Sequence, residues 1–106
     1  MDFKVIFRDA FLADLESLLR SIAAENPTAA IKLGDTIVQR GESLAFFPER
    51  YPRVRQRWGV RRFIVRKYFK VFYLIDHEKR IVEIMRCWDG RRQIDPALPQ
   101  DIPHSR

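Results

Sequence analysis

The residues of this chain best suited to chemistry are its arginines and lysines, and they are concentrated in its second half. Fourteen of the twenty lie between Arg50 and Arg92, a stretch with only four acidic residues, whereas the first 49 residues carry five basic and eight acidic side chains. Cationic groups arranged along one surface bind polyanions, of which RNA and DNA are the commonest in a cell. The aromatic residues interleaved with these charges are Phe63, Tyr68, Phe69, Phe72, Tyr73 and Trp88. We therefore expect a nucleic-acid or ribonucleoprotein surface. The alternative is a solvated basic surface that only maintains solubility.

Other chemistries have little support in the sequence. The chain has one cysteine, Cys87, and two histidines, His77 and His104, which fall short of a usual metal-ligand set. Cys87 cannot form an internal disulfide, and its apolar neighbours are typical of a small buried core residue. No glycine-rich phosphate loop is present. We therefore expect no metal and no cofactor.

No targeting or membrane segment is expected. The N-terminus lacks the pattern of a signal peptide, and no apolar run approaches the ~20 residues of a membrane span. The sequence therefore predicts a cytoplasmic protein without membrane contact.

A short strand and a helix are predicted at the N-terminus. Residues 3–8 alternate as a strand does, and Asp9 is expected to cap the helix that follows, from Ala10 to Glu25. The apolar residues of this helix form one stripe. They are Phe11, Leu12, Leu15, Leu18, Leu19 and Ile22.

A second helix is predicted from Thr28 to Leu44, antiparallel to the first. Asn26 can cap it, and Pro27 fits the first helical turn because the missing N–H would have no partner there. Gly34 and Gly41 lie on or beside its apolar stripe, and we expect them to permit close approach of the helices. The connection of three residues makes the pair an αα-hairpin. Four residues after this hairpin are expected to cap the core: Phe46, Phe47, Pro48 and Pro52.

Strands are predicted in the basic half of the chain. The segments are 54–58, which Gly59 ends, then 61–67, 69–75 and 80–88. Strict alternation in the last segment places Val82, Ile84, Arg86 and Trp88 on one face and Ile81, Glu83, Met85 and Cys87 on the other. The predicted fold is α+β, with the order β-α-α-β-β-β and the helical hairpin on one face of a mainly antiparallel sheet. Residues 1–92 form a single domain, and residues 93–106 form a proline-rich tail.

The order of these segments resembles the RelE/ParE superfamily of type II toxin–antitoxin modules, also called plasmid-stabilisation proteins. Segments 59–65, 68–76 and 84–92 carry the resemblance after the strand-helix-helix start. It covers residues 3 to 95 and implies a toxin that inhibits growth. RelE-type members cut mRNA in the ribosomal A site, whereas ParE-type members poison DNA gyrase, and the shared fold does not choose between them.

A RelE-like activity would assign catalysis to three cations. Lys70 falls where a RelE-type active-site arginine sits, and Arg86 and Arg91 fall near the second basic cluster. This chain departs from that pattern because it has no Tyr beyond Arg92 and has Asp89 where many relatives have His. An ionised aspartate with a pKa of ~3.9 is a poor acid at neutral pH.

The resemblance therefore favours a ParE-like gyrase poison, with a RelE-like ribonuclease as the alternative and a non-toxic nucleic-acid-binding regulator as the second. The residues expected to bind the target or nucleic acid are Arg55, Arg57, Arg62, Arg66, Arg92 and Trp88. The implied partners are a cognate antitoxin and either DNA gyrase or the ribosome with its mRNA. The antitoxin is expected to wrap the helical hairpin or to lie against the open sheet.

Overall fold

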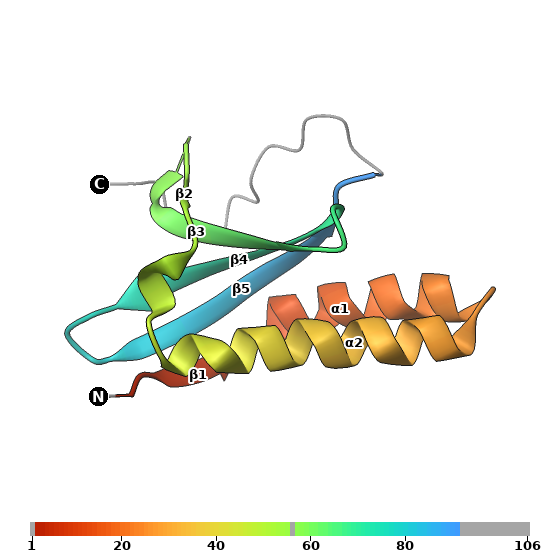
Figure 1. Ribbon diagram of the computed structural model, residues 1–106, viewed down its shortest axis with the longest axis horizontal. Coiled ribbons are helices and arrows are strands. Elements are labelled where there is room, and N and C mark those ends of the chain that lie inside the picture. The colour runs from red at the N-terminus through yellow and green to blue at the C-terminus, as the bar shows by residue number, and fades with distance from the viewer. Residues whose placement is uncertain (1, 56, 92–106) are drawn as a thin grey trace.

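Two helices cover one face of a five-stranded sheet, and no helix of the described residues covers the opposite face, which we call the open face (Figure 1). The computed structural model describes residues 2–55 and 57–91, so the predicted tail 93–106 lies outside the described residues. The strands lie in the order β1 (Lys4–Phe7), β5 (Ile81–Asp89), β4 (Phe69–Asp76), β3 (Arg57–Val65) and β2 (Arg53–Val54). β1 is parallel to β5, and all other neighbours are antiparallel. The predicted α+β class, with a helical hairpin on a mainly antiparallel sheet, is confirmed.

The first helix, α1, spans Asp9–Ala23, and its start differs from the prediction. Asp9 is the first helical residue rather than the cap. Arg8 holds the N-cap position and makes no side-chain cap hydrogen bond. The reason lies in the sheet, because the backbone N–H of Arg8 donates to the carbonyl of Ile84 in β5 (3.0 Å). The chain therefore passes directly from β1 into α1.

The second helix, α2, spans Pro27–Glu42 and begins as predicted. The side chain of Asn26 accepts a hydrogen bond from the backbone N–H of Ala29 at 3.0 Å, and a proline occupies the first helical position. Such a cap satisfies one of the N–H groups that a helix start leaves without partners.

The two helical glycines permit close packing, as predicted, although against different elements. A Cβ atom at Gly34 would lie 2.8 Å from Cδ1 of Leu19 on α1. A Cβ atom at Gly41 would lie 2.9 Å from the ring of Phe7 on β1. Gly34 therefore sets the approach of the two helices, and Gly41 sets the approach of α2 to the sheet.

Two short 3₁₀ helices, η1 (Ser43–Ala45) and η2 (Pro48–Arg50), carry the chain from α2 to the far edge of the sheet. The predicted core cap is confirmed for Pro48, which is buried, and is wrong for the other three residues. Phe46 is 56% exposed, Phe47 is 82% exposed and Pro52 is exposed. Phe47 has a left-handed backbone with φ of 49°, and in this loop its ring lies in solvent.

The strands of the second half are β2 (Arg53–Val54), β3 (Arg57–Val65), β4 (Phe69–Asp76) and β5 (Ile81–Asp89). The predicted break at Gly59 is wrong, because this residue lies inside β3. A glycine at this point costs little packing, since no atom lies within 4 Å of where its Cβ would be. β2 pairs with β3 through only two residues, with an irregular register.

A β-bulge in β5 overturns the predicted faces of its last residues. Phe72 pairs with Arg86, whereas the next residue of β4, Tyr73, pairs with Ile84, so β5 contains one extra residue at this point. An extra residue reverses the alternation beyond it. Cys87 therefore joins Ile84 in the core beneath the helices, and Trp88 packs on the opposite face.

The main core lies between the helices and the sheet. Its largest fully buried side chains include Phe11, Leu33, Ile37, Phe63 and Tyr73. A smaller apolar cluster lies on the open face. Within the described residues, no helix combines the length and apolar character needed to cross a membrane.

Candidate functional site

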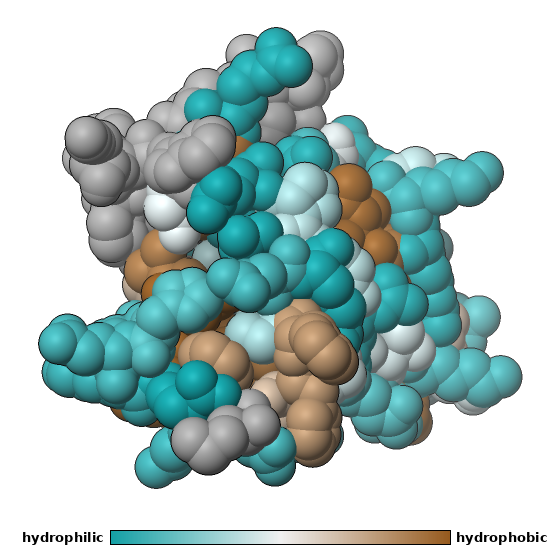
Figure 2. All heavy atoms as spheres, turned by 60° about the vertical axis from the view of Figure 1, so that its left-hand side comes forward, coloured by the Kyte–Doolittle hydropathy of each residue, from teal (hydrophilic) through white to brown (hydrophobic). Residues whose placement is uncertain are grey.

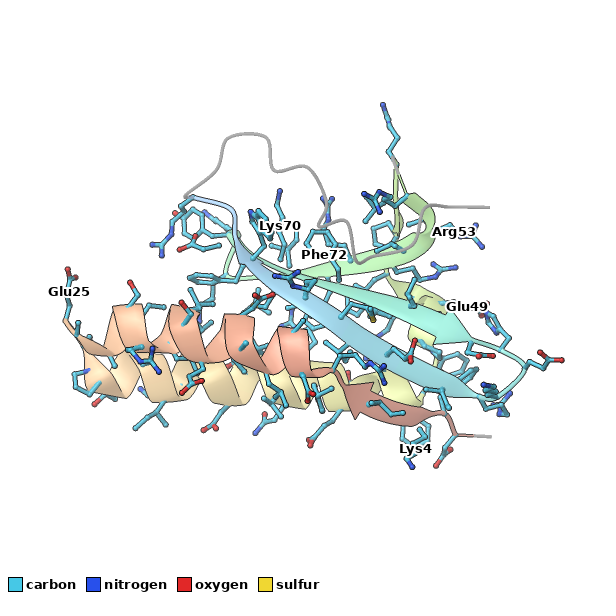
Figure 3. All side chains as sticks on the ribbon, turned by 180° about the vertical axis from the view of Figure 1, so that it is seen from behind. Lys4, Glu25, Glu49, Arg53, Lys70 and Phe72 are labelled. Atoms are coloured by element: carbon cyan, nitrogen blue, oxygen red, sulfur yellow. The ribbon has the colours of Figure 1, made fainter. Side chains whose placement is uncertain are left out.

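Four side chains from three strands meet on the open face of the sheet, and we call them the open-face cluster: Arg62, Lys70, Phe72 and Trp88. Arg62 pairs with Phe72 across β3 and β4, and Lys70 pairs with Trp88 across β4 and β5. Paired residues in neighbouring strands hold their Cβ atoms about 4.5–5.5 Å apart. Lys70 and Phe72 project away from the helices (Figure 3). Neither cation forms an ion pair with a described residue.

The cations of the open-face cluster stand on an apolar floor. Phe72 is buried with Val54 and Val60, and Leu74, Met85 and Trp88 pack against them. Poorly hydrated surroundings strengthen the attraction between a cation and an anionic ligand. The half-buried indole of Trp88 beside Lys70 offers a surface on which a base or another flat group can stack.

Arg86 is held by a carboxylate from the helical layer. Its Nε donates to Oδ2 of Asp14 at 2.7 Å, and its Nη2 donates to Oδ1 at 3.0 Å. The backbone N–H of Cys87 donates to the same Oδ2 at 3.0 Å. Strand β1 has ended at this level, so the carboxylate of Asp14 takes the place of a neighbouring strand. Arg86 is thus a structural cation rather than a member of the open-face cluster.

Arg91 is also paired. Its Nε lies 3.1 Å from Oδ1 of Asp89, and its Nη2 lies 3.0 Å from Oδ2. The guanidinium also stands 5.1 Å from the ring centres of Tyr68 and Phe69. Of the three residues predicted to be catalytic, two therefore point at the protein's own carboxylates, and only the half-buried Lys70 projects from the open face without a carboxylate partner among the described residues.

Two groups with proton-transfer chemistry near the site are buried and neutral. Burial raises the pKa of Tyr73 from 10.0 to about 12, and its hydroxyl donates to the carbonyl of Pro48 at 2.6 Å. Burial, with a smaller contribution from the charge of Asp14, raises the pKa of the Cys87 thiol from 9.0 to about 12. Both groups lie in the core between the helices and the sheet, so neither faces a ligand on the open face.

The other residues predicted to bind the target do not converge on one point. Arg57 begins β3 and its side chain is buried, whereas Arg55 lies exposed between β2 and β3. Arg66 lies beyond the other end of β3, a strand of nine residues that spans about 26 Å. Arg62 and Trp88 alone share the open-face cluster with Lys70. Arg92 lies outside the described residues.

The turn between β3 and β4 presents two further cations on a strained backbone. Arg66 and Lys67 have φ angles of 53° and 72°, and the N–H of Tyr68 donates to the carbonyl of Val65 at 3.3 Å. Two consecutive left-handed residues define a turn that normally requires Asn and Gly. Because Arg and Lys replace them, the alternating pattern of residues 61–67 gave no signal of this turn.

The comparison with known protein families decides the identity of the fold. The family model described as "ParE toxin of type II toxin-antitoxin system, parDE" matches residues 5–94. The chain belongs to this ParE toxin family. No curated protein is similar enough in sequence to match.

Solved structures show the same fold as this ParE-family protein. A chain of a chromosomal ParDE toxin–antitoxin system from P. aeruginosa superposes with a TM-score of 0.71 at 18% identity, covering 82% of this chain and 95% of that one. A chain of the RelBE2 toxin–antitoxin complex from Mycobacterium tuberculosis superposes with a TM-score of 0.62 at 21% identity, covering 84% and 92%. The isolated E. coli RelE toxin superposes with a TM-score of 0.52 at 15% identity, covering 86% of this chain and 87% of that one. The resemblance to the RelE/ParE superfamily is confirmed.

Sequence reasoning missed Asp14, on which the end of β5 depends in this ParE-family protein. A signal was present, because Asp14 lies on the helix one position before Leu15 and four before Leu18, both of which are buried. An acid beside an apolar helical stripe requires a hydrogen-bonding partner. That requirement did not identify Arg86, which is 72 residues away in sequence.

We predict that Asp14→Ala lowers the free energy of unfolding by about 2–4 kcal/mol, because it leaves Arg86 without its carboxylate and Cys87 N–H without an acceptor. Urea unfolding measures the loss. The matched control is Glu16→Ala on the same helix, where an exposed ion pair with Arg20 at 2.9 Å is worth less than about 0.5 kcal/mol. Equal losses for the two variants would contradict the structural role of Asp14.

We predict that the free energy of unfolding falls between pH 9 and 12 because of Cys87 and Tyr73. Below pH 9 these two groups should not make it depend on pH. Both folded-state pKa values are raised to about 12, so these groups stay neutral in the folded protein while they ionise in the unfolded chain. Urea unfolding as a function of pH measures this. Cys87→Ala should remove the loss of stability that begins near pH 9. An unchanged pH profile in Cys87→Ala would disprove the contribution of the thiol.

Proposed function

We propose that this protein is the growth-inhibiting toxin of a type II toxin–antitoxin module and acts as a ParE-like poison of DNA gyrase. The observation that carries the choice of mechanism is the pairing of Arg86 with Asp14 and of Arg91 with Asp89. RNA cleavage through the 2′-hydroxyl needs free cations at the phosphate and a group that moves a proton. Of the cations considered above, Lys70 and Arg62 are the two that could contact the phosphate.

The second requirement has no candidate among the described strand residues of the open face. Tyr73 and Cys87 are buried on the helix side, and Asp89 is engaged with Arg91. The open-face cluster is instead suited to binding, since two cations and two aromatic rings stand together on an apolar floor. Gyrase held on cleaved DNA would offer both protein surface and phosphates to such a face.

Induced expression in bacteria should arrest growth and accumulate cleaved DNA–gyrase complexes, while RNA 5′-end mapping shows intact mRNA. The double variant Arg62→Glu, Lys70→Glu should bind the gyrase–DNA complex about tenfold more weakly or worse, because two attractive charges become repulsive. Lys32→Glu, an exposed change on α2, is the matched control and should arrest growth as the wild type does.

Three outcomes separate the alternatives. In-frame cuts in translated mRNA that disappear in Lys70→Ala would identify a ribonuclease instead. Unimpaired growth on induction of the wild-type chain would favour a regulator without toxicity. Growth arrest without cleaved gyrase complexes or cut mRNA would point to another target.

For the antitoxin, we propose the groove between the two helices as the docking surface. This groove, of about 620 Å³, lies between α1 and α2 and is lined mainly by Leu12, Leu15, Leu19, Ala23, Pro27, Ala30 and Ile31. Leu12 is 47% exposed and Ile31 is 65% exposed, which is unfavourable in an isolated protein. An amphipathic antitoxin helix would cover these side chains.

The apolar lining predicts how the toxin–antitoxin complex responds to mutation and salt. Leu12→Asp with Ile31→Asp should weaken antitoxin binding about 100-fold, because charges replace buried apolar contacts. Lys32→Glu, beside the groove but outside its lining, should bind normally. Calorimetry should also show a dissociation constant that changes little with salt. Steep weakening at high salt would place the antitoxin on the basic strands instead.

A further inference from the structure

The loop between α2 and β2 exposes two adjacent aromatic rings, which the sequence pattern places in the core. Phe47 is 82% exposed and Phe46 is 56% exposed. Figure 2 views the molecule from the side where this loop lies and shows apolar side chains grouped among hydrophilic ones. Phe47 also has φ of 49°, which is uncommon for a bulky residue. An exposed ring on a strained backbone is unfavourable in the isolated protein and marks an interaction site.

The rings are exposed, but the backbone carbonyls of the loop are held by side chains of the loop itself and of the sheet. Arg50 Nη1 donates to the carbonyl of Phe46 at 2.9 Å, and Tyr73 donates to the carbonyl of Pro48 at 2.6 Å. Arg61 Nη1 donates to the carbonyl of Glu49 at 3.1 Å and to that of Tyr51 at 2.7 Å.

Main-chain groups complete this network. The carbonyl of Ala45 accepts from Phe3 N–H at 2.8 Å, and the carbonyl of Phe47 accepts from Arg50 N–H at 3.2 Å. A rigid aromatic pair loses little conformational entropy when it binds, which is the property of an interface anchor.

The neighbouring charges favour a protein partner over a nucleic acid. The guanidinium groups of Arg50 and Arg61 donate to carbonyls of the loop itself, so they are turned toward the loop backbone rather than toward a phosphate. The loop also carries a charge of the opposite sign, since Glu49 is exposed two residues after Phe47. The complementary surface is therefore an apolar pocket on a protein.

The loop is also separate from the groove assigned to the antitoxin. The groove includes Ile31 near the start of α2, and Phe46 follows the end of this helix, about 20 Å away along its axis. We propose that Phe46 and Phe47 are the anchor by which this protein docks on the protein that it inhibits. This inference rests on the proposed toxin function, and under that proposal the partner is DNA gyrase.

The test compares the full chain with Phe47→Gly and with Phe46→Ser, Phe47→Ser. The exposure of the rings predicts unchanged folding, and glycine at position 47 relieves the left-handed strain, so neither variant should lower the unfolding temperature. We expect both variants to lose growth arrest on induction, to bind purified gyrase about tenfold more weakly or worse, and to bind the antitoxin normally. Lys32→Ser, which removes an exposed side chain outside both the loop and the groove lining, should still arrest growth.

Growth arrest by the double variant tests the anchor role whichever protein is the target. If the double variant folds and still arrests growth, the anchor role is wrong. The anchor role is also wrong if the variant keeps its affinity for gyrase and instead binds single-stranded RNA or the antitoxin more weakly. If the wild type arrests growth without cleaved gyrase complexes and the double variant does not arrest growth, the anchor stands and the choice of gyrase fails. A wild type that leaves growth unimpaired overturns both.

Discussion

The carboxylate of Asp14 is the contact on which the second half of β5, and with it the open face of the sheet, depends. β1 ends at Phe7, whereas β5 continues to Asp89, so the second half of β5 would be an open edge. Asp14 closes it by accepting the backbone N–H of Cys87 and by holding Arg86 through two hydrogen bonds. One helical side chain thereby fixes the helices against the sheet, satisfies a strand edge and removes a cation from the ligand surface.

This arrangement divides the basic residues by task. Arg50 and Arg61 hold the carbonyls of the loop after α2, and Arg86 ties β5 to α1. Arg62 and Lys70 stand on the open face without a carboxylate partner among the described residues. Part of the positive charge in the second half of the sequence therefore serves the fold itself rather than a ligand surface. Such a division suits a protein that recognises a partner more than one that assembles several cations around a scissile phosphate.

Local patterns predicted most of the fold, and contacts distant in sequence account for the rest. The helical stripes, the cap at Asn26 and the strand alternation depend on neighbouring residues, so they are visible in the sequence. The bulge in β5 is set by its pairing with β4, which the sequence of β5 alone does not show. Because of the bulge, Cys87 lies in the helix-side core and Trp88 lies on the open face, opposite to the predicted alternation. For the same reason, the sequence could show neither that Trp88 lies beside Lys70 nor that Arg86 has a partner on α1. Phe47 was misplaced because an aromatic residue after a helix is usually buried.

The distance between the two apolar surfaces constrains how neutralisation can work. An antitoxin helix that fills only the groove around Leu12 and Ile31 leaves Phe46 and Phe47 uncovered, because the loop lies about 20 Å further along α2. If the loop anchors the target, the antitoxin must either extend along α2 or obstruct the target by its bulk. An extension over that distance takes about 13 residues as a helix or about 6 as an extended strand. A short antitoxin segment could therefore bind tightly without neutralising, so affinity and neutralisation are separable properties of this pair of surfaces.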